Sequence, residues 1–217
     1  EAPGEVRTRV CVLMDRQLEQ MIRLVNDLLD ASRIAQGKIE LRKAPIELGT
    51  ALREVMDAER PLAEAAGLAL EANLPAEPLV VDGDPLRLMQ VFRNLLQNAR
   101  KYTEAGGRIT VSLAPEHGEA VVRIRDTGVG IPPAKLEAIF EMFAQIEAGR
   151  PRSQGGLGIG LGLARRLLAL HGGSVQAFSE GLGRGSEFVV RLPLVPQGRE
   201  PDRLGSREEA SVLAPGS

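Results

Sequence analysis

Apolar residues recur every three or four positions between about Val10 and Ile34, the spacing of one stripe along a helix. The stripe consists of Cys11, Met14, Leu18, Met21, Ile22, Val25, Leu28 and Leu29. Polar residues fill the other positions, so this helix presents an apolar face that it cannot bury alone. We expect a long coiled-coil-type helix that packs against a hairpin mate, a second copy of the chain, or the chain's own next domain.

Downstream of this stretch, short apolar strands alternate with helical segments. We expect strands at 38–42, 68–72, 79–81, 108–114, 119–126, 174–178 and 186–193, and helices at 48–66, from 85 onward and at 157–170. Pro45 is expected to open a turn, residues 115–118 to connect a hairpin, and a short helix to follow Pro132 and Pro133. This order predicts an α/β fold, a two-layer α/β sandwich with one mixed sheet and its helices on a single face.

Two polar stretches lack any apolar period. Residues 144–156 are polar and glycine-rich, which predicts a mobile loop. Residues 197–217 are rich in glycine, proline, serine and charge, which predicts a disordered tail or linker.

Composition narrows the class of protein. The chain has 217 residues, 43% of them hydrophobic and 26% charged, as is ordinary for a soluble globular protein. Its net charge is −2 and only 3% of its residues are aromatic, so neither a basic field nor base stacking favours nucleic acid. The single cysteine, Cys11, forms no internal disulfide, which favours a reducing compartment. No run of about 18 apolar residues occurs, so we expect a cytoplasmic chain without membrane contact, with any anchor lying elsewhere.

Candidate chemistry begins in the segment that Asp84 and Pro85 open, an N-cap followed by proline at the first helical position. Asn94 and Asn98 stand four residues apart, so both amides project from one helix face, and Lys101 lies a turn further on. Amide oxygens with a lysine suit a divalent cation that bridges phosphates. Asparagines on a merely solvated face remain the alternative.

A second motif follows an apolar strand and reads Asp126-Thr127-Gly128-Val129-Gly130-Ile131. A carboxylate at this place can accept a hydrogen bond from an exocyclic amino group such as that of adenine, and glycines let the backbone approach a flat base. A simple turn at the end of a strand would use the same residue types.

The third motif is a glycine run, with Gly156, Gly158 and Gly160 just before a helix. Backbone N–H groups at a helix start form a phosphate site. No Gly-Lys-Ser/Thr follows, which excludes a Walker A loop. The dinucleotide fingerprint needs glycine five residues after its first, where this chain has leucine or arginine.

Taken in order, these motifs resemble the catalytic and ATP-binding domain of sensor histidine kinases, a Bergerat-type fold. The two asparagines, the Asp126 turn, Phe140-x-x-Phe143 and the glycine run resemble that family's N, G1, F and G2 boxes, and His171-Gly172-Gly173 matches its usual tripeptide. Residues 24–37 look like the second helix of the family's dimerisation hairpin. The resemblance implies three parts: a partial dimerisation and phosphotransfer helix at 1–36, an ATP-binding catalytic domain at 37–196, and a tail or linker at 197–217.

The resemblance also implies ATP and Mg²⁺ as cofactors and assigns roles to residues. Asn98, with Asn94 beside it, would hold the metal, and Lys101 would complete the catalytic set by reaching a phosphate. Tyr102 would lie against the base or ribose, and Asp126 would accept the adenine amino group. The residues expected to line the nucleotide are Asn98, Lys101, Tyr102, Asp126, Gly128, Gly130, Ile131, Gly156, Leu157, Gly158, Ile159, Gly160 and Leu161.

Three features depart from the family pattern. Leu157 stands where the family often has Thr or Ser, and Gly162 stands where Ala is usual, which should loosen the helix start by about 0.5–1 kcal/mol. The family's acceptor motif on the first hairpin helix is also missing.

Phe140 and Phe143 are expected either to anchor the expected loop or to pack in the core. Both histidines, His117 and His171, are expected to be structural or exposed.

The resemblance therefore implies a histidine kinase that transfers the γ-phosphate of ATP to a histidine outside this chain. The implied partners are a phospho-acceptor hairpin, a response regulator receiver domain, and a second copy joined through the N-terminal helix. Related ATPases of the same fold carry a glutamate where this chain has Asn94, and an amide cannot act as a general base. An ATPase of that fold and a non-catalytic nucleotide-binding module remain the alternatives.

Overall fold

The computed structural model describes residues 14, 18, 21, 22, 25, 26, 28–30, 32, 33, 36, 38–144 and 158–196. Its helices are α2 (Leu48–Ala65), α3 (Pro85–Tyr102) and α4 (Gly160–Leu170), with two 3₁₀ turns, η1 (Pro133–Lys135) and η2 (Ala138–Phe140). Its strands are β1 (Ala44–Glu47), β2 (Ala69–Asn73), β3 (Val80–Gly83), β4 (Arg108–Glu116), β5 (Glu119–Asp126), β6 (Ser174–Phe178) and β7 (Ser186–Pro193).

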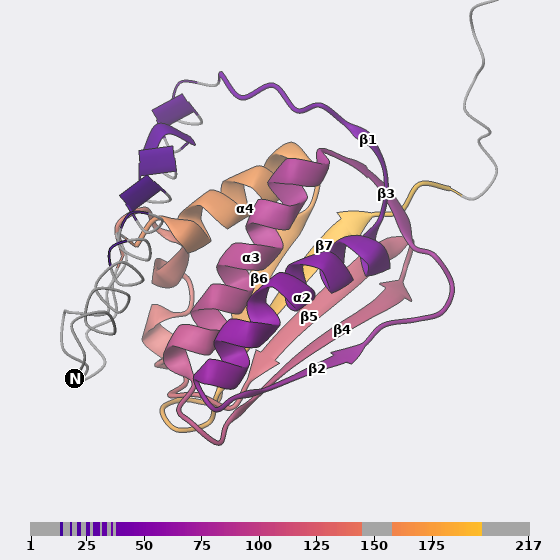
Figure 1. Ribbon diagram of the computed structural model, residues 1–217. Coiled ribbons are helices and arrows are strands. Elements are labelled where there is room, and N and C mark those ends of the chain that lie inside the picture. The colour runs from indigo at the N-terminus through magenta and orange to yellow at the C-terminus, as the bar shows by residue number, and fades with distance from the viewer. Residues whose placement is uncertain are drawn as a thin grey trace, which may run out of the picture.

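Five strands form the main sheet, in the order β2-β4-β5-β7-β6. Only the β2–β4 pair is parallel, so the sheet is mixed. The three helices cover one face of this sheet, as Figure 1 shows. Alternate strand residues and one stripe of each helix meet between the two layers and form the core, with Phe92 of α3 fully buried near its centre. The expected two-layer α/β sandwich is confirmed.

A second, two-stranded sheet pairs β1 with β3 in antiparallel fashion, so the expectation of a single sheet is wrong. The expected strand at 38–42 is also wrong, because these residues are extended without a strand partner and pairing starts at Ala44. Pro45 lies inside β1 rather than opening a turn. Proline is tolerated there because β1 has only one neighbouring strand and leaves its other edge unpaired.

Local sequence explains the main boundaries. The Glu47 carboxylate caps α2 by accepting from the backbone N–H groups of Gly49 at 2.8 Å and Thr50 at 2.6 Å. The β4–β5 hairpin turns through only two residues, His117 and Gly118, whose φ angles of 52° and 83° fit a type I′ turn. The expected four-residue turn is therefore too long. The helix expected after Pro133 is replaced by η1 and η2.

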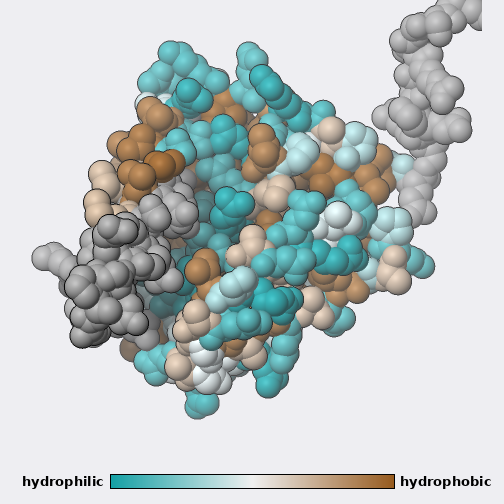
Figure 2. Space-filling view, viewed as in Figure 1, coloured by the Kyte–Doolittle hydropathy of each residue, from teal (hydrophilic) through white to brown (hydrophobic). Residues whose placement is uncertain are grey.

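The described positions between Met14 and Arg33 are helical, and we call this segment the N-terminal helix. Its described apolar residues are 49–66% exposed, and Figure 2 shows apolar surface gathered along it. Which partner covers that stripe stays a prediction. Across the described ranges, no helix is long and apolar enough to cross a membrane. The expected loop at 144–156, apart from Ala144, and the expected tail at 197–217 lie outside the described residues.

Candidate functional site

The site is built on α3, whose start is fixed by Asp84. Its Oδ1 accepts from the Arg87 backbone N–H at 3.2 Å, and Pro85 takes the first helical position, as predicted. One face of α3 is buried in the core. The buried residues are Leu88, Val91, Phe92, Leu95, Leu96 and Ala99. Because this face is fixed by packing, the opposite face carries Asn94 and Asn98, both half-buried.

Asn94 connects α3 to the start of α4. Its Nδ2 donates to the carbonyl of Gly160 at 3.3 Å, and a Cβ placed on Gly160 would contact the Asn94 side chain at 3.6 Å. The residue before α4, Ile159, provides no side-chain cap. Among the described residues, Ile159 therefore gives the first N–H groups of α4 no side-chain acceptor, and these groups lie next to Asn94 of α3.

Gly158 forms a backbone contact with Phe143, on the other side of residues 145–157, which lie outside the described residues. Its carbonyl accepts from the Phe143 N–H at 3.0 Å, and its φ of 71° is a left-handed conformation. A Cβ at this position would lie 2.5 Å from the carbonyl oxygen of Ala144, so only glycine fits. The neighbouring candidates Gly156 and Leu157 lie outside the described residues, and their roles stay predictions.

Asp126 ends β5 and is only 3% exposed. Its Oδ1 accepts from the N–H of Gly128 at 2.8 Å and of Ser186 at 3.3 Å, and its Oδ2 accepts from the Ser186 hydroxyl. Three donors therefore fix a buried carboxylate, which still has lone pairs for a further donor. The sequence did not predict a role for Ser186. It follows a glycine-rich turn that the apolar pattern indicated only as a connection between two strands.

Gly128 brings the turn after Asp126 against the end of α3. The N–H of Val129 donates to the Tyr102 carbonyl at 3.0 Å, and a Cβ on Gly128 would collide with the same carbonyl. Gly130, with φ of 70°, lies so close to the Gly181 carbonyl that a Cβ would collide there too. Both glycines are required by the close approach of these carbonyls, whereas the predicted approach to a base stays a prediction.

The β6–β7 connection completes this side of the site. The N–H groups of Gly183 and Gly185 donate to the carbonyls of Val129 at 2.8 Å and Gly128 at 3.1 Å. Ile131 donates through its N–H to the Ser179 Oγ at 3.0 Å. The turn after Asp126 is therefore held from two directions, by α3 and by the β6–β7 connection.

Lys101 and Tyr102 lie at the end of α3 that meets this turn. The Lys101 ammonium is 4.8 Å from the centre of the Tyr102 ring, within the range of a cation–π contact. Both side chains are half-buried. The two residues thus lie where α3 meets the Asp126 turn, and their contacts with a nucleotide stay predictions.

The two phenylalanines of the Phe140-x-x-Phe143 motif differ. Phe140 is buried and packs edge-on against Phe188, with ring centres 6.3 Å apart. Phe143 is 61% exposed and has a left-handed φ of 67°, which is unusual for a bulky residue. Gly162 faces this segment, since a Cβ there would lie 3.1 Å from the Phe140 carbonyl oxygen. Close packing therefore accounts for glycine at a position where alanine is usual.

Neither histidine lies free in the site. His171 is buried, its Nε2 accepts from the Asp84 N–H at 2.9 Å, and its Nδ1 lies 2.7 Å from the Leu167 carbonyl, to which it donates. Burial lowers the pKa of His171 below the ordinary 6.5. His117 is exposed in the β4–β5 turn. The prediction that both are structural or exposed is confirmed.

Comparison with known protein families finds a family model that matches the part of the chain from β3 to the end of the described residues. A family model described as "Histidine kinase-, DNA gyrase B-, and HSP90-like ATPase" matches residues 83–196, the segment that carries all three motifs. The description of this family, as ATPase-like, implies ATP binding.

Two relatives of this chain are named as histidine kinases, and one solved structure aligns with most of it. The circadian input-output histidine kinase CikA of Synechococcus elongatus is 36% identical over 177 residues, 81% of this chain and 23% of that protein. The hybrid signal transduction histidine kinase D of Dictyostelium discoideum is 33% identical over 189 residues, 85% of this chain and 12% of that protein. The structure of full-length ShkA in complex with AMPPNP aligns with a TM-score of 0.72 at 32% identity, covering 86% of this chain and 38% of that one. The chain thus spans less than a quarter of these two curated relatives.

Proposed function

Because this chain belongs to the histidine kinase-, DNA gyrase B-, and HSP90-like ATPase family, we propose that it is the ATP-binding catalytic domain of a two-component sensor histidine kinase. It transfers the γ-phosphate of Mg-ATP to a histidine outside this chain. One observation carries the proposal: hydrogen bonds join α3 to the start of α4 through the Asn94 amide, and to the turn after Asp126 through the Tyr102 carbonyl.

The adenine end of the nucleotide is assigned to Asp126. The oxygens of this buried side chain accept hydrogen bonds, and the Ser186 hydroxyl and two backbone N–H groups hold it in one orientation. The exocyclic amino group of adenine is a matching donor. Gly128 and Gly130 let the turn that follows Asp126 pack closely against the Tyr102 and Gly181 carbonyls, and so hold Asp126 beside the end of α3.

The phosphate end is assigned to the start of α4 and to Lys101. The N–H groups at the start of α4, which receive no side-chain cap from Ile159, favour negative charge. Gly158, Gly160 and Leu161 belong to that first turn or to its approach. An ammonium at Lys101 would neutralise part of the phosphate charge.

Magnesium fits the donor set on α3. Across the described ranges, no group of three or more His, Cys, Asp or Glu side chains could hold a metal ion. Mg²⁺ commonly keeps several waters and binds through one or two protein oxygens plus substrate phosphates, which suits the Asn98 amide with Asn94 next to it. The ion would supply positive charge between the phosphates.

Asn94 favours transfer over hydrolysis. Its amide donates to the Gly160 carbonyl and has no basic nitrogen that could remove a proton from water. Phosphoryl transfer depends mainly on positioning and charge, so an acceptor supplied by another segment can react without a base at this position.

The partners follow from the same proposal. The two histidines of the chain are held in the core or lie in a distant turn, so the acceptor belongs to a separate helical hairpin. The N-terminal helix with its exposed apolar stripe suits one half of such a hairpin, paired in a dimer. A response regulator receiver domain would then take the phosphate.

Phosphoryl transfer to a supplied acceptor tests this proposal. The native chain is mixed with Mg-ATP and a helical hairpin that carries an acceptor histidine, and acid-labile phosphate on the hairpin is measured. We expect labelling of that hairpin and none when its histidine is replaced by glutamine. Brisk release of phosphate without an acid-labile product would instead favour the ATPase alternative.

A further inference from the structure

Asp30 inverts the usual burial pattern of the N-terminal helix. Its side chain is buried, with the residue 8% exposed, whereas the neighbouring Leu28 and Leu29 are 49% and 50% exposed. Aspartate is seldom buried unless it is paired. A buried carboxylate on a helix with exposed leucines indicates a specific polar contact.

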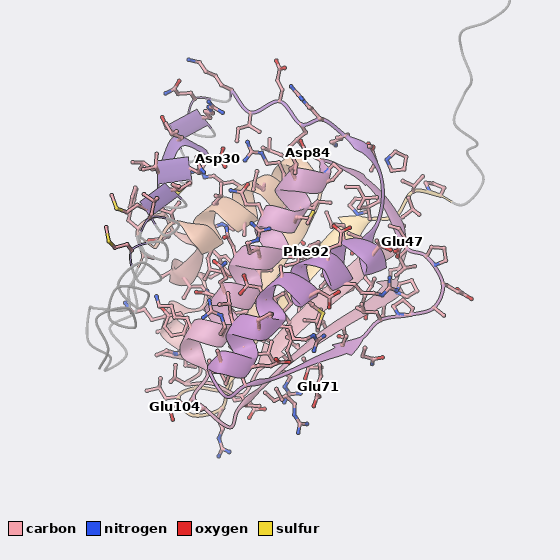
Figure 3. All side chains as sticks on the ribbon, in the orientation of Figure 1. Asp30, Glu47, Glu71, Asp84, Phe92 and Glu104 are labelled. Carbon is pink, nitrogen blue, oxygen red and sulfur yellow. The ribbon has the colours of Figure 1, made fainter. Side chains whose placement is uncertain are left out.

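The contact is made with the first turns of α3. Asp30 Oδ2 accepts from the Arg87 Nη1 at 2.5 Å and from the Gln90 Nε2 at 3.0 Å, and the same Arg87 nitrogen donates to the Gln90 Oε1 at 2.9 Å. Figure 3 shows Asp30 between the N-terminal helix and the helices of the domain. Arg87 and Gln90 thus form a notch that fits one carboxylate, which we call the α3 notch.

The α3 notch is in line with the amide face of the site. Arg87, Gln90, Asn94 and Asn98 are separated by three or four residues, so they follow one another along a single face of α3. Gln90 and Asn94 are one helical turn apart, about 6 Å along the axis. A helix held in the notch therefore stands at a fixed place relative to the proposed metal site.

The chain after the N-terminal helix is tied to the same end of α3. The Arg42 N–H donates to the Asp84 Oδ2 at 2.9 Å, while Oδ1 of that carboxylate caps α3. Two independent contacts, Asp30 with the notch and Arg42 with Asp84, thus fasten the N-terminal segment to the start of one helix.

Docking through Asp30 leaves the apolar stripe open. Residues two positions apart in an α-helix are separated by about 200° of rotation, so Asp30 lies nearly opposite Leu28 of the stripe. The N-terminal helix can therefore dock on the domain with one side and pair with another helix through the other.

We propose that Asp30 docks the N-terminal helix in the α3 notch and so sets the position of that helix relative to the nucleotide site. The group that the α3 notch binds is a single carboxylate on a helix, which accepts hydrogen bonds from Arg87 and Gln90. The value of this arrangement for phosphoryl transfer rests on the proposed function, whereas the docking itself does not.

Distance measurement between two spin labels tests the docking. Labels are placed at Met14→Cys on the N-terminal helix and Glu54→Cys on the exposed side of α2, in a Cys11→Ser background diluted with unlabelled chain. We expect one narrow distance for the native residues at the notch. Asp30→Ala should broaden it, with the ratio of docked to undocked molecules lowered about tenfold, as expected for loss of a charge-assisted hydrogen bond.

Two further variants sharpen the result. Asp57→Ala removes the surface pair with Arg60, whose charged atoms are 3.9 Å apart, and should leave the distance narrow. Asp30→Arg combined with Arg87→Glu restores the pair with reversed charges and should narrow the distance again. A native-like narrow distance for Asp30→Ala contradicts the docking.

ATP binding is measured on the same samples to separate the two proposals. Asp30→Ala should bind ATP as the native chain does, because Asp30 is not among the residues assigned to the nucleotide. A native chain that binds no ATP contradicts the proposed function, whatever the distance shows about docking.

Discussion

At the scale of single residues, His171 shows how a polar side chain serves the fold rather than the chemistry. It accepts from the Asp84 N–H and donates to the Leu167 carbonyl, and so joins the C-terminal end of α4 to the N-cap of α3. Gly83 makes this possible, because a Cβ there would lie 2.9 Å from the imidazole ring. The histidine is held neutral, because both of its bonds need one bare and one protonated nitrogen.

This state predicts a pH-dependent stability. Burial lowers the pKa of His171 in the folded chain, with Lys43 acting in the same direction and Asp84 and Asp82 opposing it. The unfolded chain therefore binds a proton more readily. Stability is complete above the ordinary pKa of 6.5 and falls as the pH drops below it, by up to about 1.4 kcal/mol per pH unit.

Thermal unfolding between pH 7.5 and 5.5 measures the effect. His171→Gln should lower the Tm at pH 7.5 and flatten its decline with acid. His117→Asn, in the exposed turn, should keep the native decline. Equal declines in the native chain and His171→Gln would mean that other groups cause the acid sensitivity.

Single residues also show which parts of the candidate site the sequence could and could not predict. The sequence singled out Asp126, Gly128 and Gly130 as residues for a base, and it did not show that the two glycines are needed for close packing against the Tyr102 and Gly181 carbonyls. Ser186 was not predicted, because its role depends on β7 pairing with β5, which places Asp126 opposite Ser186. That register is a tertiary fact with no local signature.

At the scale of elements, the rotation of α3 decides which residues face the nucleotide. The apolar face packs on the sheet, and a polar contact with α2 fixes the remaining freedom. Glu59 of α2 is buried; its Oε1 accepts from the Gln97 Nε2 at 2.9 Å, and its Oε2 lies 3.5 Å from the Arg100 Nε. Gln97 precedes Asn98 directly, so this cluster helps to fix the amide face.

Removal of Glu59 should therefore destabilise the domain. Glu59→Ala leaves the Gln97 amide and the Arg100 guanidinium without their carboxylate, and we expect a loss of about 2–3 kcal/mol in the free energy of unfolding. Glu71→Ala, which breaks an exposed pair with Arg108, should cost less than about 1 kcal/mol. Denaturant titration of both variants decides, and similar small losses would contradict a structural role for the cluster.

Elements were predictable where period and caps agreed. The Asp84-Pro85 start of α3 and the ends of β5, β6 and β7 match the prediction, because each combines a clear apolar period with a turn or cap. The strand expected at 38–42 failed because its alternation reflects partial packing of Ile39 on the core, without a pairing partner. The separate β1–β3 sheet could not be foreseen, since pairing partners of short strands are set by the whole fold.

At the scale of the whole molecule, the fold presents two surfaces to which we assign different roles. One collects the amide face, the Asp126 turn and the start of α4. The other is the apolar stripe of the N-terminal helix, which remains exposed in the described part of the chain. The docking of Asp30 on α3 would link the two. The fold class could be predicted because ordered motifs constrain it jointly. The relation of the N-terminal helix to the domain could not, because it rests on a few polar contacts made by Asp30 and Arg42.

The central claim is that three separated segments form one site for Mg-ATP, and calorimetric binding tests it most directly. ATP and ADP are titrated with and without Mg²⁺ into the native chain, Asn98→Ala and Asp126→Asn. Asn98→Ala should remove most of the gain in ATP affinity that Mg²⁺ gives. Asp126→Asn should weaken ATP and ADP alike by about tenfold or more, because its contact is with the base. Unchanged ADP affinity in Asp126→Asn, or an unchanged magnesium effect in Asn98→Ala, would contradict the account.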